Sequence, residues 1–297
     1  MSEKRIITDE HVIYHFRPDM EPKWYVDDGD IIELHAPDGV HGQIQSESDT
    51  MDNVDEDNIN DSVGPIFING AKPGDTLLFD IHDIRVPSEQ GYVLAFPTFG
   101  LLQDYLEKGQ TKITRIENNH VFFNNLRIPV KPVIGTIGVA PMEKTWSSLY
   151  GHDFGGNMDC TDICAGSRLY LPIFVEGGLL AMGDGKAVMS DGEVCGTGVG
   201  VPLVITGRVE VIKKKINRPL IETEKEWMTI ANAKTFEEAC QMANLDLIEI
   251  LMRVHNISWT EAYMLTSLVA DLRICQVVNP HSTVRMAISK EYLPNAL

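Results

Sequence analysis

The first two thirds of the chain consists of short apolar runs, many alternating with polar residues and separated by Gly, Pro, Asn and Asp. A period of two is typical of β-strands with one buried face, and the separating residues are typical of turns. The longest predicted strands cover residues 76–86, 133–139 and 201–211. Shorter strands are predicted at residues 4–7, 11–16, 24–26, 31–34 and 64–69, with a hairpin that joins 121–123 to 126–128.

Helical periodicity is found only near the end of the chain. Thr235 and Glu238 have the spacing of a capping box, and apolar residues follow at helical spacing to about Asn256. Ser258 and Glu261 repeat this signature and open a second helix that we expect to run through Leu272, before a last strand pair at 273–278 and 282–288. The sequence therefore predicts a β-rich α+β fold, with sandwich-like or barrel-like sheets and a late helical pair packed on them.

The domain organisation is expected to be simple. The chain has no internal repeat and no low-complexity linker. We expect one domain over residues 1–297, or two intimately joined lobes of about 1–145 and 146–297. Residues 91–106 are apolar and aromatic, with Gly and Pro interruptions, and are interpreted as a loop that walls a pocket.

The stretch from 151 to 200 holds the candidate chemistry. Apolar runs at 169–175 and 179–182 flank a Glu-Gly-Gly turn, which predicts a hairpin. Pairing of the two runs would place the polar residues before the first beside those after the second. These residues are Asn157, Asp159, Asp184, Asp191 and Glu193. Carboxylates that crowd together need a cation or shared protons, whereas the simpler interpretation is that they are ordinary Asp-Gly turn residues.

Composition narrows the choice of partners. The 297 residues include 25 basic and 43 acidic side chains, for a formal net charge of −18, which argues against nucleic acid and anionic membranes as partners. No window approaches 18 apolar residues, and the first ten residues lack the apolar segment of a signal peptide. Five cysteines without a C-x-x-C pair favour a reducing compartment, so we expect a cytoplasmic location.

Three other groups of residues could carry chemistry. A loop after residues 31–34 holds His35, Asp38 and His41. The acidic run from 49 to 61 lacks the central glycine and terminal glutamate of an EF-hand loop, so a solvated loop is expected there. Cys160 lies near the polar stretch, and His152 is available as its partner if the thiol is a nucleophile.

Several motifs, taken together, resemble the acetamidase/formamidase family. They are G-Q-I at 42–44, G-P-I-F-I-N-G-A-K-P-G-D at 64–75, P-V-I-G-T-I-G-V-A-P at 132–141, G-G-N-M-D at 155–159, L-Y-L-P-I-F-V-E-G at 169–177, D-G-E-V-C-G-T-G at 191–198, E-A-Y-M-L at 261–265 and I-C-Q-V-V-N-P at 274–280. The match runs in order from about residue 31 to 289. The resemblance implies a cytoplasmic amidohydrolase, a homodimer or higher homo-oligomer, that cleaves formamide, acetamide or similar small amides to acid and ammonia. It also implies a divalent ion, zinc first and calcium or another ion otherwise.

The resemblance also implies roles for individual residues. His35, Asp38, Asp159 and Asp184 are the expected metal ligands, and the bound ion would polarise the carbonyl and activate water. Glu193 is the candidate general base, and Asn157 is the candidate donor to the oxyanion. Asp191 and Lys186 complete the candidate catalytic set.

The chain departs from the family pattern at several positions. Ala-Pro separates His35 from Asp38, as if two residues were inserted. Lys186 stands where the family usually has His, Ser190 where Gly is usual, and Gly200 where Glu is common. Loss of a histidine ligand would weaken or change metal binding, whereas a protonated lysine could replace part of the cation's charge.

Two alternatives to a metal-dependent amidase remain. A divergent family member could bind a small ligand or serve as an oligomeric scaffold, with Lys186 neutralising a metal-free site. A thiol amidase would instead use Cys160 or Cys195, would be inactivated by iodoacetamide and would be indifferent to chelators.

Overall fold

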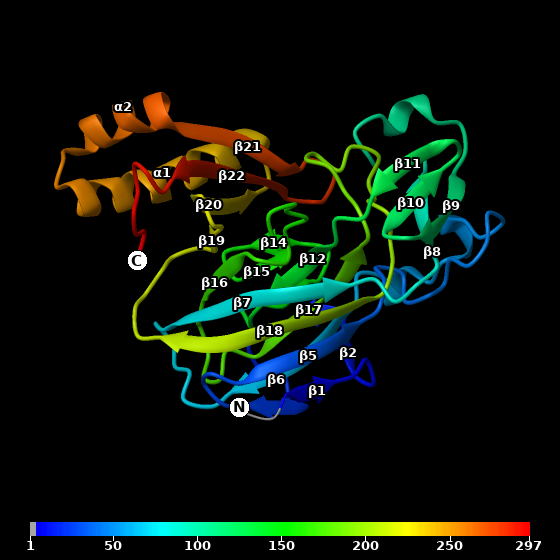
Figure 1. The fold of residues 1–297 in the computed structure, drawn as a ribbon, viewed down its shortest axis with the longest axis horizontal. Coiled ribbons are helices and arrows are strands. Elements are labelled where there is room, and N and C mark those ends of the chain that lie inside the picture. The colour runs from blue at the N-terminus through cyan, green and yellow to red at the C-terminus, as the bar shows by residue number, and fades with distance from the viewer. Residues whose placement is uncertain (1–3) are drawn as a thin grey trace.

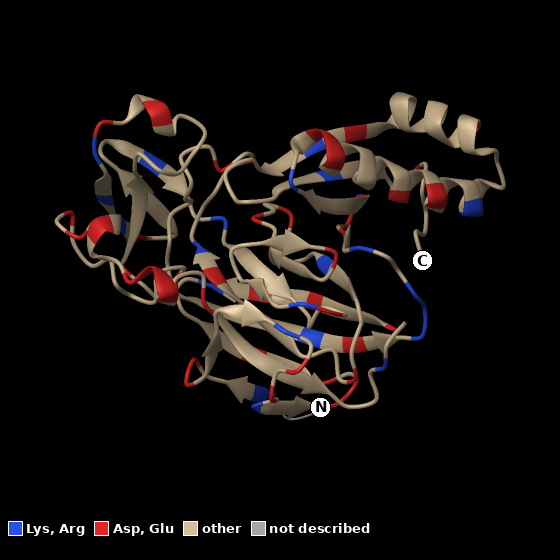
Figure 2. Ribbon diagram, turned by 180° about the vertical axis from the view of Figure 1, so that it is seen from behind, with Lys and Arg blue, Asp and Glu red and all other residues tan. Residues whose placement is uncertain are grey.

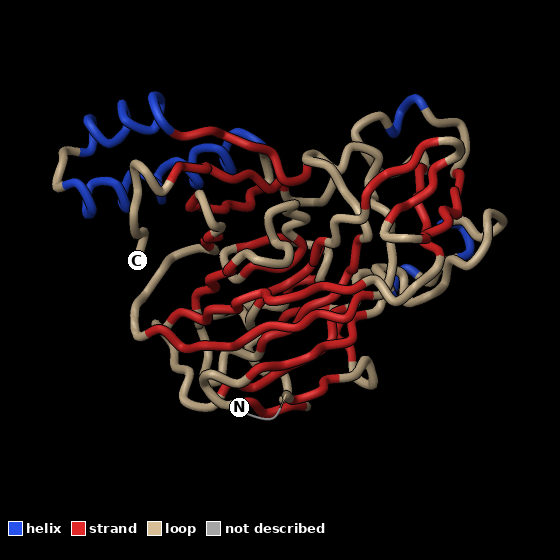
Figure 3. Tube along the Cα trace, viewed as in Figure 1, coloured by secondary structure: helices blue, strands red, loops and turns tan. Residues whose placement is uncertain are grey.

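The computed structural model describes residues 4–297 as a strand-rich fold with two late helices (Figures 1 and 3). This confirms the predicted β-rich α+β class. Among residues 4–297, neither helix has the length and apolarity needed to cross a bilayer. Acidic residues are found on strands, helices and loops (Figure 2).

Two large sheets form the body of the protein. The order of the nine-stranded sheet is β1 (Arg5–Ile7), β5 (Ile31–Ala36), β18 (Leu203–Ile212), β7 (Thr76–Arg85), β16 (Arg168–Pro172), β19 (Leu220–Glu222), β20 (Glu226–Ala233), β22 (Ser282–Ser289) and β21 (Ala270–Gln276). The order of the seven-stranded sheet is β14 (Gly151–His152), β15 (Gly155–Asn157), β12 (Val133–Gly138), β17 (Leu180–Lys186), β6 (Ser62–Ile68) and β2 (Val12–Ile13), with β4 (Trp24–Val26) also beside β6. Each sheet takes strands from before and after residue 145.

Two smaller sheets and three short 3-10 turns complete the elements. The four-stranded sheet has the order β11 (Leu126–Pro129), β10 (His120–Phe123), β9 (Gln110–Glu117) and β8 (Gln90–Ala95). The two-stranded sheet pairs β13 (Trp146–Ser147) with β3 (His15–Phe16). The 3-10 turns are η1 (Met51–Asn53), η2 (Glu56–Asn58) and η3 (Gln103–Tyr105).

The two large sheets share one hydrophobic core. Every residue of β12 and of β17 is buried, whereas β7 alternates towards its end. Leu77, Phe79 and Ile81 from β7 join Ile134 and Ile137 from β12 in the same apolar cluster. Asp184 and Lys186, which lie on β17, are therefore held on a fully buried strand of this core.

The late helices begin where the capping signatures predict. Thr235 accepts a hydrogen bond from the Glu238 N–H at the start of α1 (Phe236–His255), and Ser258 and Glu261 form the predicted capping box of α2 (Trp259–Val269). Helix α1 packs on β20 and β22. The second helix ends before the predicted Leu272, because the residues from Ala270 onward pair with β22 as strand β21.

The predicted hairpin at 169–182 is wrong. Strand β16 pairs with β7 and β19 in one large sheet, whereas β17 pairs with β12 and β6 in the other. Gly177, Gly178 and Leu179 have φ of 74°, 66° and 55°, so the chain turns from one sheet to the other. Gly177 donates to the Ala71 carbonyl and accepts from the Ile68 N–H, which ties the turn to a different part of the chain.

The predicted loop at 91–106 is wrong over its first five residues. Strand β8 reaches Ala95 and pairs with β9 along its whole length, because tertiary pairing overrides the Gly and Pro interruptions nearby. From Phe96 onward the segment is irregular apart from η3.

Candidate functional site

Asn157, Asp159, Asp184, Lys186 and Glu193 line one cavity of about 210 Å³. The predicted convergence is therefore confirmed, although a different element produces it. Strand β12 lies between β15 and β17, so that Thr136 on β12 is opposite both Asn157 and Gly183. The two motifs meet across this shared neighbour and not across a hairpin.

The ammonium group of Lys186 lies among three carboxylates. Its Nζ is 2.8 Å from Asp184 Oδ1, 3.3 Å from Glu193 Oε1 and 3.9 Å from Asp159 Oδ1. The Lys186 side chain is 8% exposed, and those of the three acids are 1–4% exposed. We call these four residues the Lys186 cluster. One positive charge thus compensates part of the repulsion among three buried acids.

Burial and mutual interaction change the protonation of the cluster. Burial alone lowers the pKa of Lys186, but attraction to Asp184, Glu193 and Asp159 outweighs it and raises that pKa well above its ordinary value. Burial and the nearby Glu193 raise the pKa of Asp159 well above the usual range. Burial also raises the pKa of Glu193, although Lys186 opposes the shift. The lysine is therefore charged at neutral pH, and Asp159 and Glu193 hold protons more readily than exposed acids do.

The backbone holds all three acids in a conformation that is uncommon for residues other than glycine. Asp159, Asp184 and Glu193 have φ of 42°, 54° and 45°. Left-handed backbone at such residues costs on the order of 1 kcal/mol each and is concentrated at functional sites. The fold therefore accepts local strain in order to direct these side chains to one place.

Two glycines make the space that the acids occupy. A Cβ on Gly135 of β12 would lie 2.4 Å from Asp184 Oδ2 and 2.8 Å from Asp159 Oδ1, and a Cβ on Gly39 would lie 2.2 Å from Asp184 Oδ1. Any larger residue at either position would displace the carboxylates.

Two asparagines border the cluster. The Asn157 Oδ1 accepts a hydrogen bond from the Thr136 hydroxyl at 2.9 Å, which leaves the Nδ2 amide group as the donor that Asn157 can offer to the cavity. The Asn279 Nδ2 donates to Asp159 Oδ2 at 2.7 Å. Sequence reasoning missed Asn279, although its Asn-Pro motif at 279–280 was one of those that carry the family resemblance.

Two predicted metal ligands lie outside the cluster. His35 is on β5, where its Nε2 is 3.3 Å from Glu33 Oε1, and it does not line the cavity. Asp38 Oδ1 accepts from the backbone N–H groups of Val40 and Gly42, so it stabilises a turn. Neither residue lines the cavity with Asp159 and Asp184, although burial and the nearby Asp184 carboxylate both raise the pKa of Asp38. Their role as metal ligands stays a prediction.

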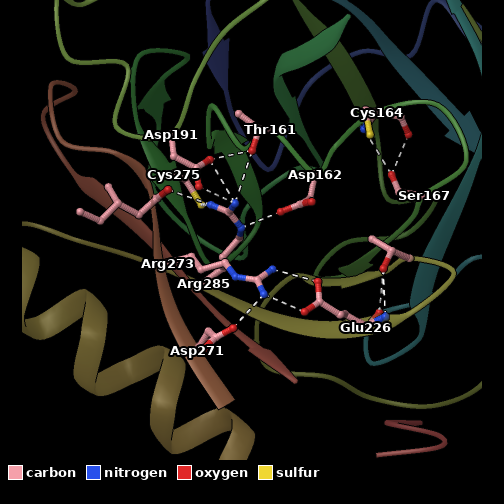
Figure 4. A network of polar contacts seen from close by, with 12 residues as sticks. Thr161, Asp162, Cys164, Ser167, Asp191, Glu226, Asp271, Arg273, Cys275 and Arg285 are labelled. Carbon is pink, nitrogen blue, oxygen red and sulfur yellow. Dashed lines mark hydrogen bonds and ion pairs between the residues drawn. The ribbon is translucent and has the colours of Figure 1, made fainter. Parts of the chain in front are cut away.

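Asp191 also leaves the predicted cluster and binds Arg285 (Figure 4). Arg285 Nη2 is 2.9 Å from Asp191 Oδ2, and Arg285 Nε is 2.7 Å from Asp162 Oδ2. The next residue, Gly192, donates its N–H to the Cys275 carbonyl at 2.8 Å. Asp191 therefore pairs with Arg285 beside the turn that carries Glu193, and it does not line the cavity.

The donor set does not fit the divalent ion that the resemblance implies. Zinc and calcium need ligand atoms that converge at about 2.0–2.6 Å from one point. Here the Lys186 ammonium lies between the three acids, and residues 4–297 contain no group of three His, Cys, Asp or Glu side chains arranged to hold a metal. The lysine thus takes the position of the cation, as the departure at residue 186 suggested.

The contacts of Cys160 and Cys195 do not provide the histidine partner that a thiol amidase would need. Cys160 is fully buried, and it neighbours Cys275 instead of a histidine. His152 lies against Trp146, with ring centroids 4.4 Å apart. Cys195 Sγ is 3.4 Å from the Thr197 carbonyl oxygen. None of these contacts forms a thiol–imidazole pair.

Comparison with known proteins decides the family. A sequence model of the acetamidase/formamidase family matches residues 2–150 and 143–293. The chain belongs to this family. The crystal structure of an acetamidase from Bacillus halodurans is similar to this chain, with 34% sequence identity and a TM-score of 0.95. The match covers 97% of this chain and 98% of the acetamidase chain. The structure of a predicted acetamidase/formamidase from Thermoanaerobacter tengcongensis has 37% sequence identity and a TM-score of 0.95. That match covers 98% of this chain and 97% of the other chain.

Similarity to a curated family member is weaker. The formamidase of Methylophilus methylotrophus is 24% identical over 250 positions, and the match covers 63% of this chain and 61% of that protein. The chain spans 66% and 61% of the two curated relatives that it matches.

Proposed function

We propose that this family member hydrolyses the C–N bond of small linear amides and releases a carboxylic acid and ammonia. The observation that carries the proposal is the Lys186 cluster, which places a charged lysine and three buried acids in one cavity beside the amide group of Asn157. The acetamidase and formamidase names of its relatives support the same class of reaction.

Glu193 acts as the general base in this proposal. Its raised pKa brings a carboxylate closer to neutrality, where a base is most effective. The Gly198 N–H donates to Glu193 Oε1 at 3.1 Å and, together with Lys186, fixes that oxygen. Glu193 takes a proton from water as the water oxygen bonds to the carbonyl carbon. It then gives the proton to the nitrogen as the C–N bond breaks, so that ammonia leaves.

Asn157 and Lys186 stabilise the negative charge that develops during this attack. The Asn157 amide donates to the carbonyl oxygen as it becomes an oxyanion, an interaction worth about 3 kcal/mol when it is well placed. Lys186 lies 2.8 Å from Asp184 and 3.3 Å from Glu193, opposes the rise in the pKa of Glu193, and offsets the charge of the tetrahedral intermediate.

Ammonia release from acetamide and formamide tests the proposal. We expect turnover by the wild type and its loss, by at least about 100-fold, in Glu193→Gln, with unchanged circular dichroism. Glu176→Gln makes the same chemical change at an exposed turn and should keep wild-type activity. Wild-type rates in Glu193→Gln would refute the base assignment. Tight amide binding without turnover in the wild type would favour the ligand-binding alternative.

We also propose that the protein works in the cytoplasm as a homo-oligomer. All five cysteines are free, as expected of a reducing compartment. Helix α2 exposes Tyr263, Met264 and Leu268 by 50%, 62% and 80%, and an apolar surface of this kind marks an interaction site. Sedimentation equilibrium should give a mass of at least twice 33.1 kDa, whereas a monomer at all concentrations would contradict this proposal.

A further inference from the structure

The cavity above the Lys186 cluster is larger than formamide or acetamide requires. Its volume is about 210 Å³. An apolar protein cavity of about 150 Å³ is known to hold one benzene molecule. Both small amides are smaller than benzene, so either would leave much of this cavity to water.

The surplus space has apolar walls. Outside the polar residues of the site, the cavity is lined by the apolar side chains of Val40, Met51, Ile59, Leu94, Phe96 and Phe99. The rings of Phe96 and Phe99 stack at 5.5 Å between centroids, with an angle of 7° between their planes. Contact of these apolar walls with water contributes no binding free energy, and a formyl or acetyl group is too short to contact them.

The charges of the cavity also restrict the acyl group. Among its lining residues, Glu56, Asp159, Asp184 and Glu193 are acidic, and Lys186 is the basic residue. An amide whose acyl group carries a carboxylate would be repelled, whereas a neutral, apolar acyl group has no electrostatic cost.

We infer that the substrate is a neutral primary amide with an apolar acyl chain or ring of about six carbons, comparable to hexanamide or benzamide. The inference rests on the proposed amide hydrolysis at this site and specifies its substrate class. The amide group lies at the Lys186 cluster, and the hydrocarbon part lies against Leu94, Phe96 and Phe99. Water attacks as described above, and the products are ammonia and the corresponding acid.

The test is ammonia release from a series of amides of increasing size, from acetamide through butanamide to hexanamide, with benzamide added. Burial of one methylene is worth about 0.8 kcal/mol, or roughly fourfold in kcat/KM. We expect kcat/KM to rise on the order of 100-fold from acetamide to hexanamide. Turnover of acetamide with kcat/KM that is flat or falls along the series would overturn the substrate class but leave amide hydrolysis intact.

A substitution in the apolar wall of the cavity tests whether the rise in kcat/KM with chain length comes from this cavity. Phe99→Ala should lower kcat/KM for hexanamide by about 10-fold or more and change that for acetamide less than about threefold. Leu102→Ala is the matched control, because Leu102 is 63% exposed on the same loop and does not line the cavity. Equal losses for both substrates in Phe99→Ala would contradict the assignment.

A binding measurement keeps the inference separate from the proposed reaction. If no amide is hydrolysed, the proposed function fails, but titration calorimetry with benzamide and acetamide still decides the inference. Benzamide binding at least about 10-fold tighter than acetamide, and weakened by Phe99→Ala, would support it. Equal affinity, or no binding of either amide, would overturn it.

Discussion

Removal of the Lys186 charge gives the most direct test of how the cluster is held together. Lys186→Met keeps an unbranched side chain of similar length and deletes the ammonium. At separations of 2.8, 3.3 and 3.9 Å, each attraction to a carboxylate is worth about 4–6 kcal/mol at an effective dielectric constant of about 20. Recovered ammonium hydration and protonation of the acids offset much of this sum. A net loss of about 3–5 kcal/mol in the free energy of unfolding is expected at pH 8.

The loss should depend on pH in a defined direction. Burial raises the pKa of both acids in the folded state above their unfolded values near 4, assisted by Glu193 in the case of Asp159 and by Asp184 in the case of Glu193. The folded protein therefore binds more protons than the unfolded chain, and stability falls as pH rises through this window. Without Lys186 the pKa values of Asp159 and Glu193 rise further, so the variant should recover part of its stability between pH 8 and pH 5.5.

Urea unfolding of the wild type and variant at pH 8 and pH 5.5 provides the measurement. Lys215→Met is the control, because Lys215 is exposed and the same substitution there should change stability by about 0.5 kcal/mol or less. A Lys186→Met variant within about 1 kcal/mol of the wild type at pH 8, or one that gains no stability on acidification, would refute the proposed compensation of charge.

Three further substitutions test the construction of the site. Gly135→Ala should destabilise the protein by about 1–3 kcal/mol in urea unfolding and abolish ammonia release, because the new Cβ would lie 2.4 Å from Asp184 Oδ2. Asn157→Ala should lower kcat by about 100- to 1000-fold in steady-state assays and leave KM nearly unchanged. Asp191→Asn should lower kcat about 10-fold and shift the pH–rate profile, because it loosens the turn that carries Glu193.

Each of these three predictions has an outcome that would contradict it. Gly109→Ala places its Cβ at an ordinary contact distance of 3.4 Å and should be tolerated, so an equal loss at both glycines would remove the packing argument. A fall in kcat below about threefold in Asn157→Ala would exclude it as the oxyanion donor. If the pH–rate profile of Asp191→Asn is unchanged, the fall in kcat would reflect a general loss of stability and not a displaced Glu193.

Local sequence patterns predicted the strands and helices well because their signals are local. Alternation predicted β7 and a run rich in β-branched residues and glycine predicted β12, while the two capping signatures located both helix starts. The end of α2 and the extent of β8 were missed, since both depend on pairing with distant strands. Local sequence preferences do not show which distant strand a given strand pairs with.

The site was predicted in part, for the same reason. Asp159, Asp184 and Glu193 were grouped together on the basis of a hairpin that does not exist, because β16 and β17 lie in different sheets. His35, Asp38 and Asp191 do not line the cavity, and the sequence does not show that their side chains contact Glu33, a turn and Arg285 instead. Asn279 was missed because it lies 120 residues from Asp159, its hydrogen-bond partner.

We propose that the Lys186 ammonium, and not a divalent ion, compensates the three acids of an amide-hydrolysing site. Acetamide and hexanamide turnover, measured together with metal content after exhaustive dialysis against a chelator, tests it most directly. We expect ammonia release to persist in protein with far less than one bound ion per chain. Loss of activity on chelation, with recovery when zinc is added back, would contradict it.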